Sequence, residues 1–203
     1  MIPVTDAVDP GFAQPVENAN AVFRTVLTAI SHPGRILPVP VAPPAPPPLF
    51  ASTAAVLLAL ADLDTAVWLQ PGLDGPQVST WLRFHCGCPL VEDPATATFA
   101  VVGGDAGLGR FAVGSAERPE LGATVILQVP AFEAGDSLIL AGPGIADRTT
   151  FHVTGLDTDF RRQWGANHAL FPQGFDLVLT APGHLASLPR TTAILEDQPC
   201  MSR

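Results

Sequence analysis

The stretch TVILQV, at residues 124–129, is a short apolar run of β-type composition, and such runs decide the fold class of this chain. Other runs of the same kind occur along the chain, and Gly/Pro turns bound most of them. They are Phe99–Val102, Leu138–Ala141, Phe175–Thr180 and His184–Leu188. These runs predict the short strands of a β-sheet.

Helical patterns are interspersed with these strands. Apolar residues from Val16 to Ile30 recur at helical spacing, and His32-Pro33-Gly34 ends that helix. A short strand is predicted at Ala66–Leu69, and further helices at Ser52–Leu63, Pro76–His85 and Thr158–Leu170. Because helices are interspersed with strands, the sequence predicts an α/β fold with a mixed sheet.

The length and composition favour a single domain over residues 1–203. A chain of 203 residues that is 47% hydrophobic can bury a sizeable core. The segment Pro38–Pro48 contains seven prolines, so we expect an extended connector there, and it is a weak candidate for a domain boundary. The last residues, 197–203, are expected to be frayed.

Charge and cysteine content indicate the environment of the protein. The net charge of −9 disfavours general binding to nucleic acid or anionic membranes. No apolar run reaches the roughly 18 residues of a membrane span, and the N-terminus lacks a basic and hydrophobic leader. Three cysteines are an odd, sparse set, which argues for a reducing compartment. We therefore expect a cytoplasmic protein.

Lysine is absent, and all ten basic residues are arginine. A pyridoxal phosphate enzyme needs a lysine amine for its aldimine, and a P-loop needs a lysine on the phosphates. Neither mechanism can operate here in its usual form. Arginine can still bind a phosphate or phosphonate group through two parallel hydrogen bonds.

The stretch WLRFHCGCPLV, from Trp81 to Val91, concentrates reactive side chains. Arg83 is a candidate for binding an anion or an acidic partner, or for a structural ion pair. His85 could act as a base or contact a phosphoryl oxygen, or it could be held by a backbone partner at a helix end. Cys86 and Cys88 could bind a soft metal or form a dithiol, but no second Cys or Cys/His pair completes a zinc site.

Two further places in the chain are weaker candidates for a binding site. Gly142 and Gly144 flank Pro143 after an apolar strand, which fits a tight turn better than a phosphate cradle. Asp176 lies inside a strand-like run, so its carboxylate should find a partner. Arg190 is the candidate partner, in a structural pair or in a binding site.

Several strings of the chain, in this order, resemble the H subunit of the bacterial carbon-phosphorus lyase system for phosphonate breakdown, the PhnH family. The resemblance that they mark extends over roughly nine tenths of the chain. They are FRTVLTAISHPG (23–34), LADLDTAVWL (60–69), RFHCGCPLV (83–91), GATVILQV (122–129), GPGIAD (142–147), FPQGFDLVLT (171–180) and LPRTT (188–192). The proline-rich segment and the tail beyond Asp197 depart from the family pattern.

The resemblance implies a three-layer fold like the large domain of pyridoxal phosphate-dependent transferases, without the cofactor. It also implies a homodimer that joins the G, I and J subunits in a core complex. With an ATPase-like partner, that complex replaces the adenine of ATP by a phosphonate, so ATP is a possible substrate of the complex. The family has no established catalytic residue in this subunit, and none is assigned here.

Two functions follow, with a third as an alternative. The chain is either a scaffold without chemistry of its own or a subunit that lends binding groups to a shared nucleotide or phosphonate site. The residues expected to provide those groups are Arg83, His85, Arg190, Gly142 and Gly144. The alternative is a stand-alone metal- or thiol-dependent enzyme that uses His85, Cys86 and Cys88.

Overall fold

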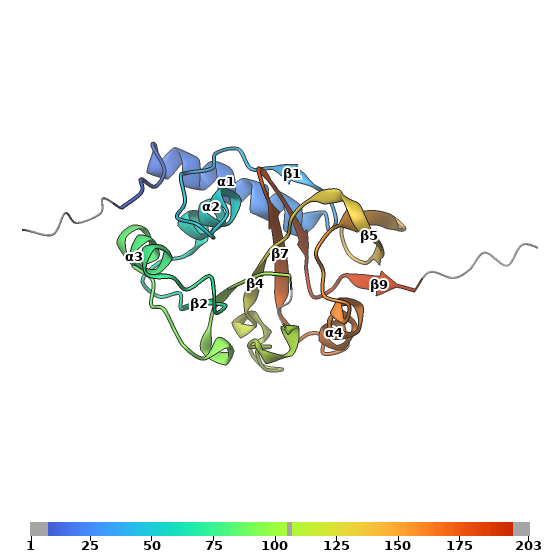
Figure 1. Cartoon of the computed structure of the whole chain (residues 1–203). Coiled ribbons are helices and arrows are strands. Elements are labelled where there is room, and N and C mark those ends of the chain that lie inside the picture. Colours follow the sequence, from blue (N-terminus) through green and yellow to red (C-terminus); the bar gives the residue numbers. More distant parts are fainter. Residues whose placement is uncertain (1–7, 105–106, 197–203) are drawn as a thin grey trace, which may run out of the picture.

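The computed structural model describes residues 8–104 and 107–196. The regular structure of this part of the chain consists of four α-helices, nine strands and three short 3-10 helices (Figure 1). The helices are α1 (Pro15–Ser31), α2 (Ala51–Leu60), α3 (Pro76–His85) and α4 (Phe160–His168). The strands are β1 (Leu37–Pro38), β2 (Val67–Leu69), β3 (Phe99–Val102), β4 (Thr124–Gln128), β5 (Phe132–Ala141), β6 (Thr149–Val153), β7 (Asp176–Ala181), β8 (His184–Leu188) and β9 (Ala193–Leu195).

The main sheet is mixed and has six strands in the order β1-β8-β7-β4-β3-β2. Strands β2, β3, β4 and β7 are parallel, whereas β8 pairs antiparallel with both β7 and β1. Strand β4, the TVILQV segment, lies between β3 and β7 near the middle of the sheet (Figure 1). It is almost entirely buried, which explains its continuous apolar composition.

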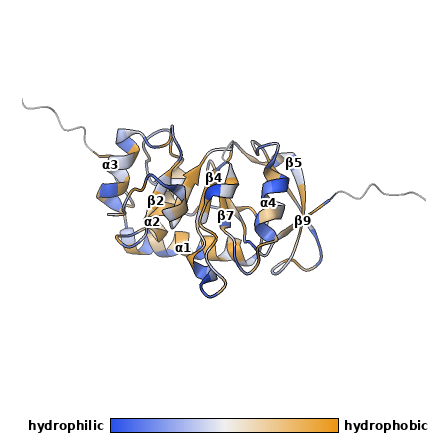
Figure 2. Cartoon of the chain, turned by 90° about the horizontal axis from the view of Figure 1, so that it is seen from below, coloured by the Kyte–Doolittle hydropathy of each residue, from blue (hydrophilic) through white to orange (hydrophobic). Residues whose placement is uncertain are grey.

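Each face of this sheet has its own hydrophobic core. On one face, α1, α2 and α3 pack against Val101 and Ile126 of the sheet. On the other face, α4 and the strands β5 and β6 pack against Val125 and Leu127. Alternate residues of β4 therefore enter opposite cores, as the two-residue period of a strand requires. In Figure 2, hydrophobic residues lie where the elements meet, and α3 and α4 carry hydrophilic stretches.

A second sheet of three strands, in the order β6-β5-β9, was not predicted in full. Strand β5 begins at Phe132 rather than Leu138, and β6 and β9 were missed. In β6, buried Phe151 and Val153 alternate with exposed residues, so the strand has no continuous apolar run. The polar positions face away from the core, and the alternation was too short to be recognised in the sequence.

The predicted helix at 52–63 ends earlier, at Leu60, because Ala61 is already extended. Beyond it, the carboxylate of Asp62 accepts a hydrogen bond from the backbone N–H of Asp64 at 3.0 Å. The hydroxyl of Thr65 also donates to Asp62. These bonds form a local turn of the kind that Asp residues favour. The predicted helix at 158–170 is likewise shorter, spanning Phe160–His168.

The proline-rich segment runs across the molecule without regular structure, except for β1 at its start. Its far end is fixed by Gln128 of β4. The side-chain amide of Gln128 donates to the carbonyl of Pro48 at 3.2 Å and accepts from the N–H of Phe50 at 2.7 Å. Gln128, a buried polar residue inside TVILQV, therefore ties the connector to the sheet. Among the described helices, none has the length and apolar character needed to cross a membrane.

Candidate functional site

Arg83 lines a cleft of about 360 Å³ between α3 and the edge of the main sheet. The other polar groups in the lining are the side chains of Asp74, Ser79 and Glu92. Within the described part of the chain, no hydrogen bond or ion pair holds the guanidinium of Arg83, and the residue is exposed. Of the two interpretations of Arg83, the structural ion pair is therefore absent among the described residues. The cleft presents one positive group and two carboxylates to a ligand or partner.

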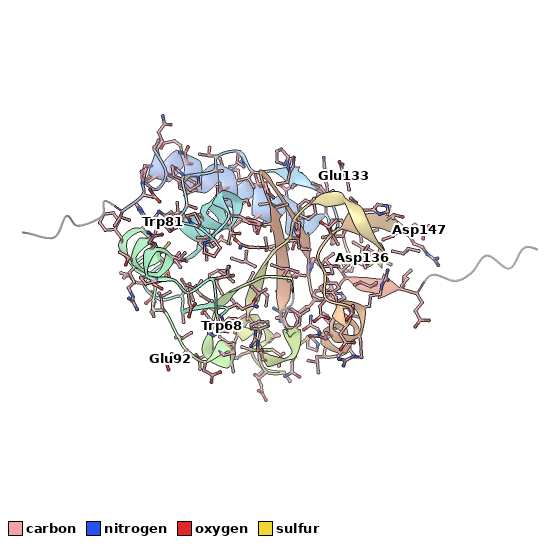
Figure 3. The ribbon with its side chains drawn as sticks, viewed as in Figure 1. Trp68, Trp81, Glu92, Glu133, Asp136 and Asp147 are labelled. Carbon is pink, nitrogen blue, oxygen red and sulfur yellow. The ribbon has the colours of Figure 1, made fainter. Side chains whose placement is uncertain are left out.

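The cleft exists because the chain returns to β2 after α3. Leu90 forms a parallel bridge with Val67, in which Val67 N–H donates to Pro89 at 2.8 Å and Val91 N–H donates to Val67 at 3.0 Å. One residue further on, the indole N–H of Trp68 donates to the carbonyl of Glu92 at 3.1 Å. Figure 3 labels Trp68 and Glu92 at this edge. The return segment thus forms one wall of the cleft and α3 forms the other.

His85 lies at the C-terminal end of α3, and its contacts hold the ring in the fold. Its Nε2 lies 2.8 Å from the backbone carbonyl of Asp9, and its ring packs against those of Trp81 and Phe84, with centroids 4.8 and 4.9 Å away. Gly11 also packs against this ring, because a Cβ there would lie 2.9 Å from Nδ1. His85 therefore joins the N-terminal segment to α3, as its backbone-partner interpretation predicts. It is not among the residues that line the Arg83 cleft.

Cys86 and Cys88, which follow α3 in the chain, form a pair of interacting free thiols. The hydrogen bond with Cys86 lowers the pKa of Cys88, and the positive charge of Arg83 acts in the same direction. The pKa of Cys86 is raised well above its usual value by the same hydrogen bond and by burial. The thiol of Cys86 also lies 3.9 Å from the carbonyl of Leu57. Over residues 8–104 and 107–196, no three His, Cys, Asp or Glu side chains group as a metal site would require.

Arg190 forms the predicted pair with Asp176 at the start of β7. Their side chains are 2.6 Å apart, and the backbone N–H of Arg190 also donates to Asp176 at 2.8 Å. The remaining guanidinium nitrogen donates to the carbonyl of Pro119 at 2.7 Å. Both side chains are largely buried, with 12% and 28% exposed. The guanidinium thus connects β7 with the segment before β4, which is a structural role.

Gly142 and Gly144 form a tight turn between β5 and β6. Both adopt positive φ angles, +140° and +84°. A Cβ at Gly144 would lie 2.2 Å from the carbonyl of Ser31, and one at Gly142 would lie 2.8 Å from that of Thr191. The turn is therefore packed against the end of α1 and the segment after β8. This close packing explains why glycine is needed at both positions.

The predicted binding residues lie in three places. Arg83 and His85 share α3, Arg190 follows β8, and the glycine turn follows β5. No described hydrogen bond or ion pair links one place to another. The prediction missed the cleft partners Asp74 and Glu92, because neither belongs to the Trp81–Val91 stretch in which reactive residues are concentrated.

Comparisons with known proteins agree with the family resemblance seen in the sequence. The model of the family described as bacterial phosphonate metabolism protein (PhnH) matches residues 10–195. A protein of Rhizobium meliloti (strain 1021) named alpha-D-ribose 1-methylphosphonate 5-triphosphate synthase subunit PhnH is 39% identical over 186 residues, which cover 90% of this chain and 93% of that protein. A putative C-P lyase subunit protein, HtxG, of Stutzerimonas stutzeri is 35% identical over 174 residues, covering 85% and 83%. The chain therefore belongs to the PhnH family of bacterial phosphonate metabolism proteins.

Proposed function

We propose that the chain is a subunit of a carbon-phosphorus lyase core complex that makes ribose 1-methylphosphonate 5-triphosphate from ATP and a phosphonate. The observation that carries the proposal is the similarity to two relatives named as subunits, each over more than four fifths of both chains. A subunit of such a complex needs no complete active site of its own. This agrees with three predicted binding places that no described hydrogen bond or ion pair joins.

Within the complex, the Arg83 cleft favours a shared binding site over a pure scaffold. An exposed guanidinium without a described partner can bind a phosphonate, a phosphate or an acidic side chain of another subunit. Asp74 and Glu92 in the same lining could bind donors of the same ligand or subunit. The cleft is open to solvent at the sheet edge, so a neighbouring subunit could close it.

The proposed partners are a second copy of this chain and the G, I and J subunits. An apolar face on α1 supports such contacts, because one apolar stripe of the helix stays exposed beside the stripe that is buried, which consists of Val22, Val26 and Ala29. The exposed fractions are 78% for Val16, 46% for Phe23, 52% for Leu27 and 37% for Ile30. We assign this α1 stripe to the homodimer.

Three further parts of the proposal follow from the family resemblance and the composition. The fold is related to the large domain of pyridoxal phosphate-dependent transferases, but no cofactor is used, because a chain without lysine cannot form an aldimine. The subunit works in the cytoplasm. ATP and the phosphonate are substrates of the complex rather than of this chain alone.

The test is reconstitution of the complex with Arg83→Ala. If Arg83 binds a substrate or an acidic group beside the site, phosphonate transfer to ATP should fall about tenfold or more, because a charge-assisted hydrogen bond is lost. Size-exclusion chromatography of the mixture should show normal assembly. Arg148→Ala is the matched control, because Arg148 is also an exposed arginine and lies just before β6.

Two outcomes contradict the shared-site role. Loss of assembly in Arg83→Ala would make the cleft a subunit contact only, and unchanged transfer would leave the chain as a scaffold. Transfer by the purified chain alone would overturn the proposal as a whole. Stoichiometric zinc in the purified protein would instead favour the alternative, an enzyme that uses His85, Cys86 and Cys88.

A further inference from the structure

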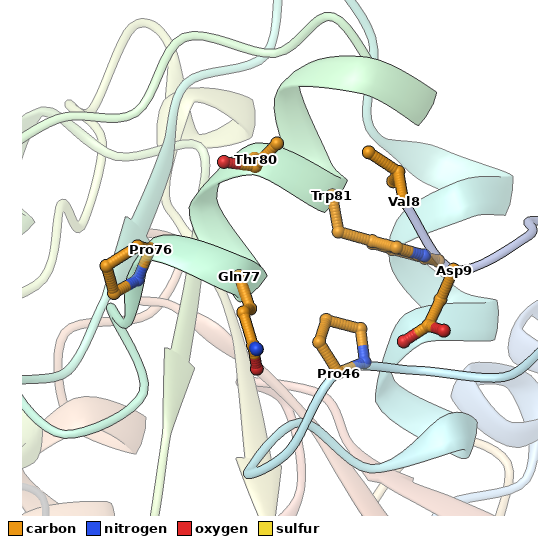
Figure 4. A pocket seen from close by; sticks show the side chains of 7 residues that line it. All are labelled: Val8, Asp9, Pro46, Pro76, Gln77, Thr80 and Trp81. Carbon is orange, nitrogen blue, oxygen red and sulfur yellow. The ribbon is translucent and has the colours of Figure 1, made fainter. Parts of the chain in front are cut away.

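A second cavity, of about 330 Å³, lies on the opposite side of α3 from the Arg83 cleft. Figure 4 shows the side chains that surround it. Gln77, Thr80 and Trp81 of α3 form one side, Pro46 of the proline-rich connector forms the base, and Asp9 of the N-terminal segment closes one end. Three segments that are distant in the sequence thus meet around one cavity, whose volume is in the range of small-molecule sites.

Among residues 8–104 and 107–196, the indole N–H of Trp81 has no hydrogen-bond partner, although the side chain is only 1% exposed. Such a buried donor is rare, because leaving it unpaired costs free energy. Trp81 lines the cavity, and its nitrogen lies at the end next to Asp9 (Figure 4). An oxygen atom of a ligand, placed between the indole and the carboxylate, would accept from this N–H.

The other polar groups of the cavity restrict the chemistry of the ligand. The carboxylate of Asp9 can only accept hydrogen bonds when ionised, whereas the Gln77 amide and the Thr80 hydroxyl can donate and accept. None of the described residues in this lining is basic, so a phosphate or carboxylate group would meet Asp9 without a positive side chain beside it. A hydroxyl fits best, because it can donate to Asp9 and accept from Trp81 at once.

The apolar groups indicate the rest of the ligand. Pro46 and Pro76 present apolar surfaces, against which the carbon skeleton of a ring could pack. We propose that this cavity binds a small, uncharged compound with several hydroxyl groups on a ring, the class of the simple sugars. The site is separate from the Arg83 cleft, and the proposal stands whether or not the chain belongs to a phosphonate-transferring complex.

The test is a titration of D-ribose with the full-length folded protein, in which binding is measured by ligand-observed NMR. Saturable binding is expected, and 2-deoxy-D-ribose and ribose 5-phosphate should both bind more weakly. Gln77→Ala and Asp9→Asn should each raise the Kd about fivefold, the usual effect of losing one hydrogen bond. Gln14→Ala is the matched control for Gln77→Ala, because Gln14 is also an exposed glutamine but does not line the cavity.

Three results would contradict the proposal that the cavity binds a sugar. Absence of saturable binding, or an unchanged Kd in both Gln77→Ala and Asp9→Asn, would overturn the proposal. Tighter binding of ribose 5-phosphate than of ribose would also overturn it, since that result would indicate an anion site. Trp81→Phe provides a second check, on the hydrogen bond from the indole N–H to the ligand. It keeps an aromatic ring but removes the N–H. Circular dichroism would verify its fold before the titration.

Discussion

His85 and Arg190 illustrate how reactive side chains can serve the fold. Each has hydrogen-bonding atoms that a catalyst or an anion site could use, yet each is held by contacts to a distant segment. His85 contacts the backbone of Asp9, and Arg190 contacts Asp176 and Pro119. Arg83 differs because its guanidinium has no such partner in the described part of the chain. At the residue scale, the presence or absence of these partners separates side chains with a structural role from side chains that are available to a ligand.

The Arg190–Asp176 pair should matter for stability. Arg190→Ala leaves Asp176 largely buried without its partner and removes the bond to Pro119, so we expect the free energy of unfolding to fall by about 2–3 kcal/mol. Urea unfolding would measure this change. Arg162→Ala is the control, because its pair with Asp159 is mostly exposed and should contribute little. Equal effects of the two substitutions would contradict the structural role of Arg190.

The thiol pair predicts a shift in acidity. Because the hydrogen bond from Cys86 lowers the pKa of Cys88, Cys86→Ala should raise that pKa, and the thiolate should form at higher pH than in the parent protein. Thiolate absorbance in a Cys200→Ser background would follow the titration. Cys86→Ser keeps a hydroxyl donor and should preserve more of the shift. A Cys88 pKa that is the same in all three proteins would show that the thiols do not interact.

At the scale of elements, α3 organises both candidate sites. One side of the helix carries Arg83 and Ser79 toward the sheet-edge cleft, and another carries Gln77 and Thr80 toward the Trp81 cavity. Buried residues between them, Val78 and Leu82 among them, fix the helix against the core. The sequence predicted this helix correctly from Pro76 to His85. It could not indicate which segments would form the opposite walls, because these come from distant parts of the chain.

Helix α1 makes a prediction about assembly. Leu27→Asp places a carboxylate in the exposed α1 stripe and should shift the proposed homodimer toward monomer, because burying an unpaired charge at an interface is costly. Analytical ultracentrifugation would measure the association. Arg24→Ala changes the net charge by the same amount at an exposed position of the same helix, and it should leave the dimer intact. A Leu27→Asp protein that stays dimeric would place the homodimer contact elsewhere.

At the scale of the whole molecule, β4 joins the two hydrophobic cores. Ile126 packs in the core formed with the helices α1–α3, and Val125 and Leu127 pack in the core on the other face. Because both cores share one strand, loss of packing on one face should affect the other. The two layers that cover the sheet are therefore expected to unfold together.

This arrangement can be tested with a single core substitution. Ile126→Ala removes a fully buried side chain and should lower the free energy of unfolding by about 2–5 kcal/mol. Trp81 reports on the helical core, and Trp164 reports on the other. In single-tryptophan variants that keep one or the other, both fluorescence transitions should shift by the same amount in urea. A shift seen only for Trp81 would mean that the cores unfold separately.

The amino-acid sequence by itself determined the main strands and helices of this protein, the exclusion of lysine chemistry, the Asp176–Arg190 pair and the PhnH resemblance. These depend on local patterns or on the residues present, which need no knowledge of the fold. Only the tertiary structure decided that His85 is held by Asp9 and that, among the described residues, the guanidinium of Arg83 and the indole N–H of Trp81 have no partner. The physical reason is that each of these properties depends on contacts between segments far apart in the chain, which local patterns do not encode.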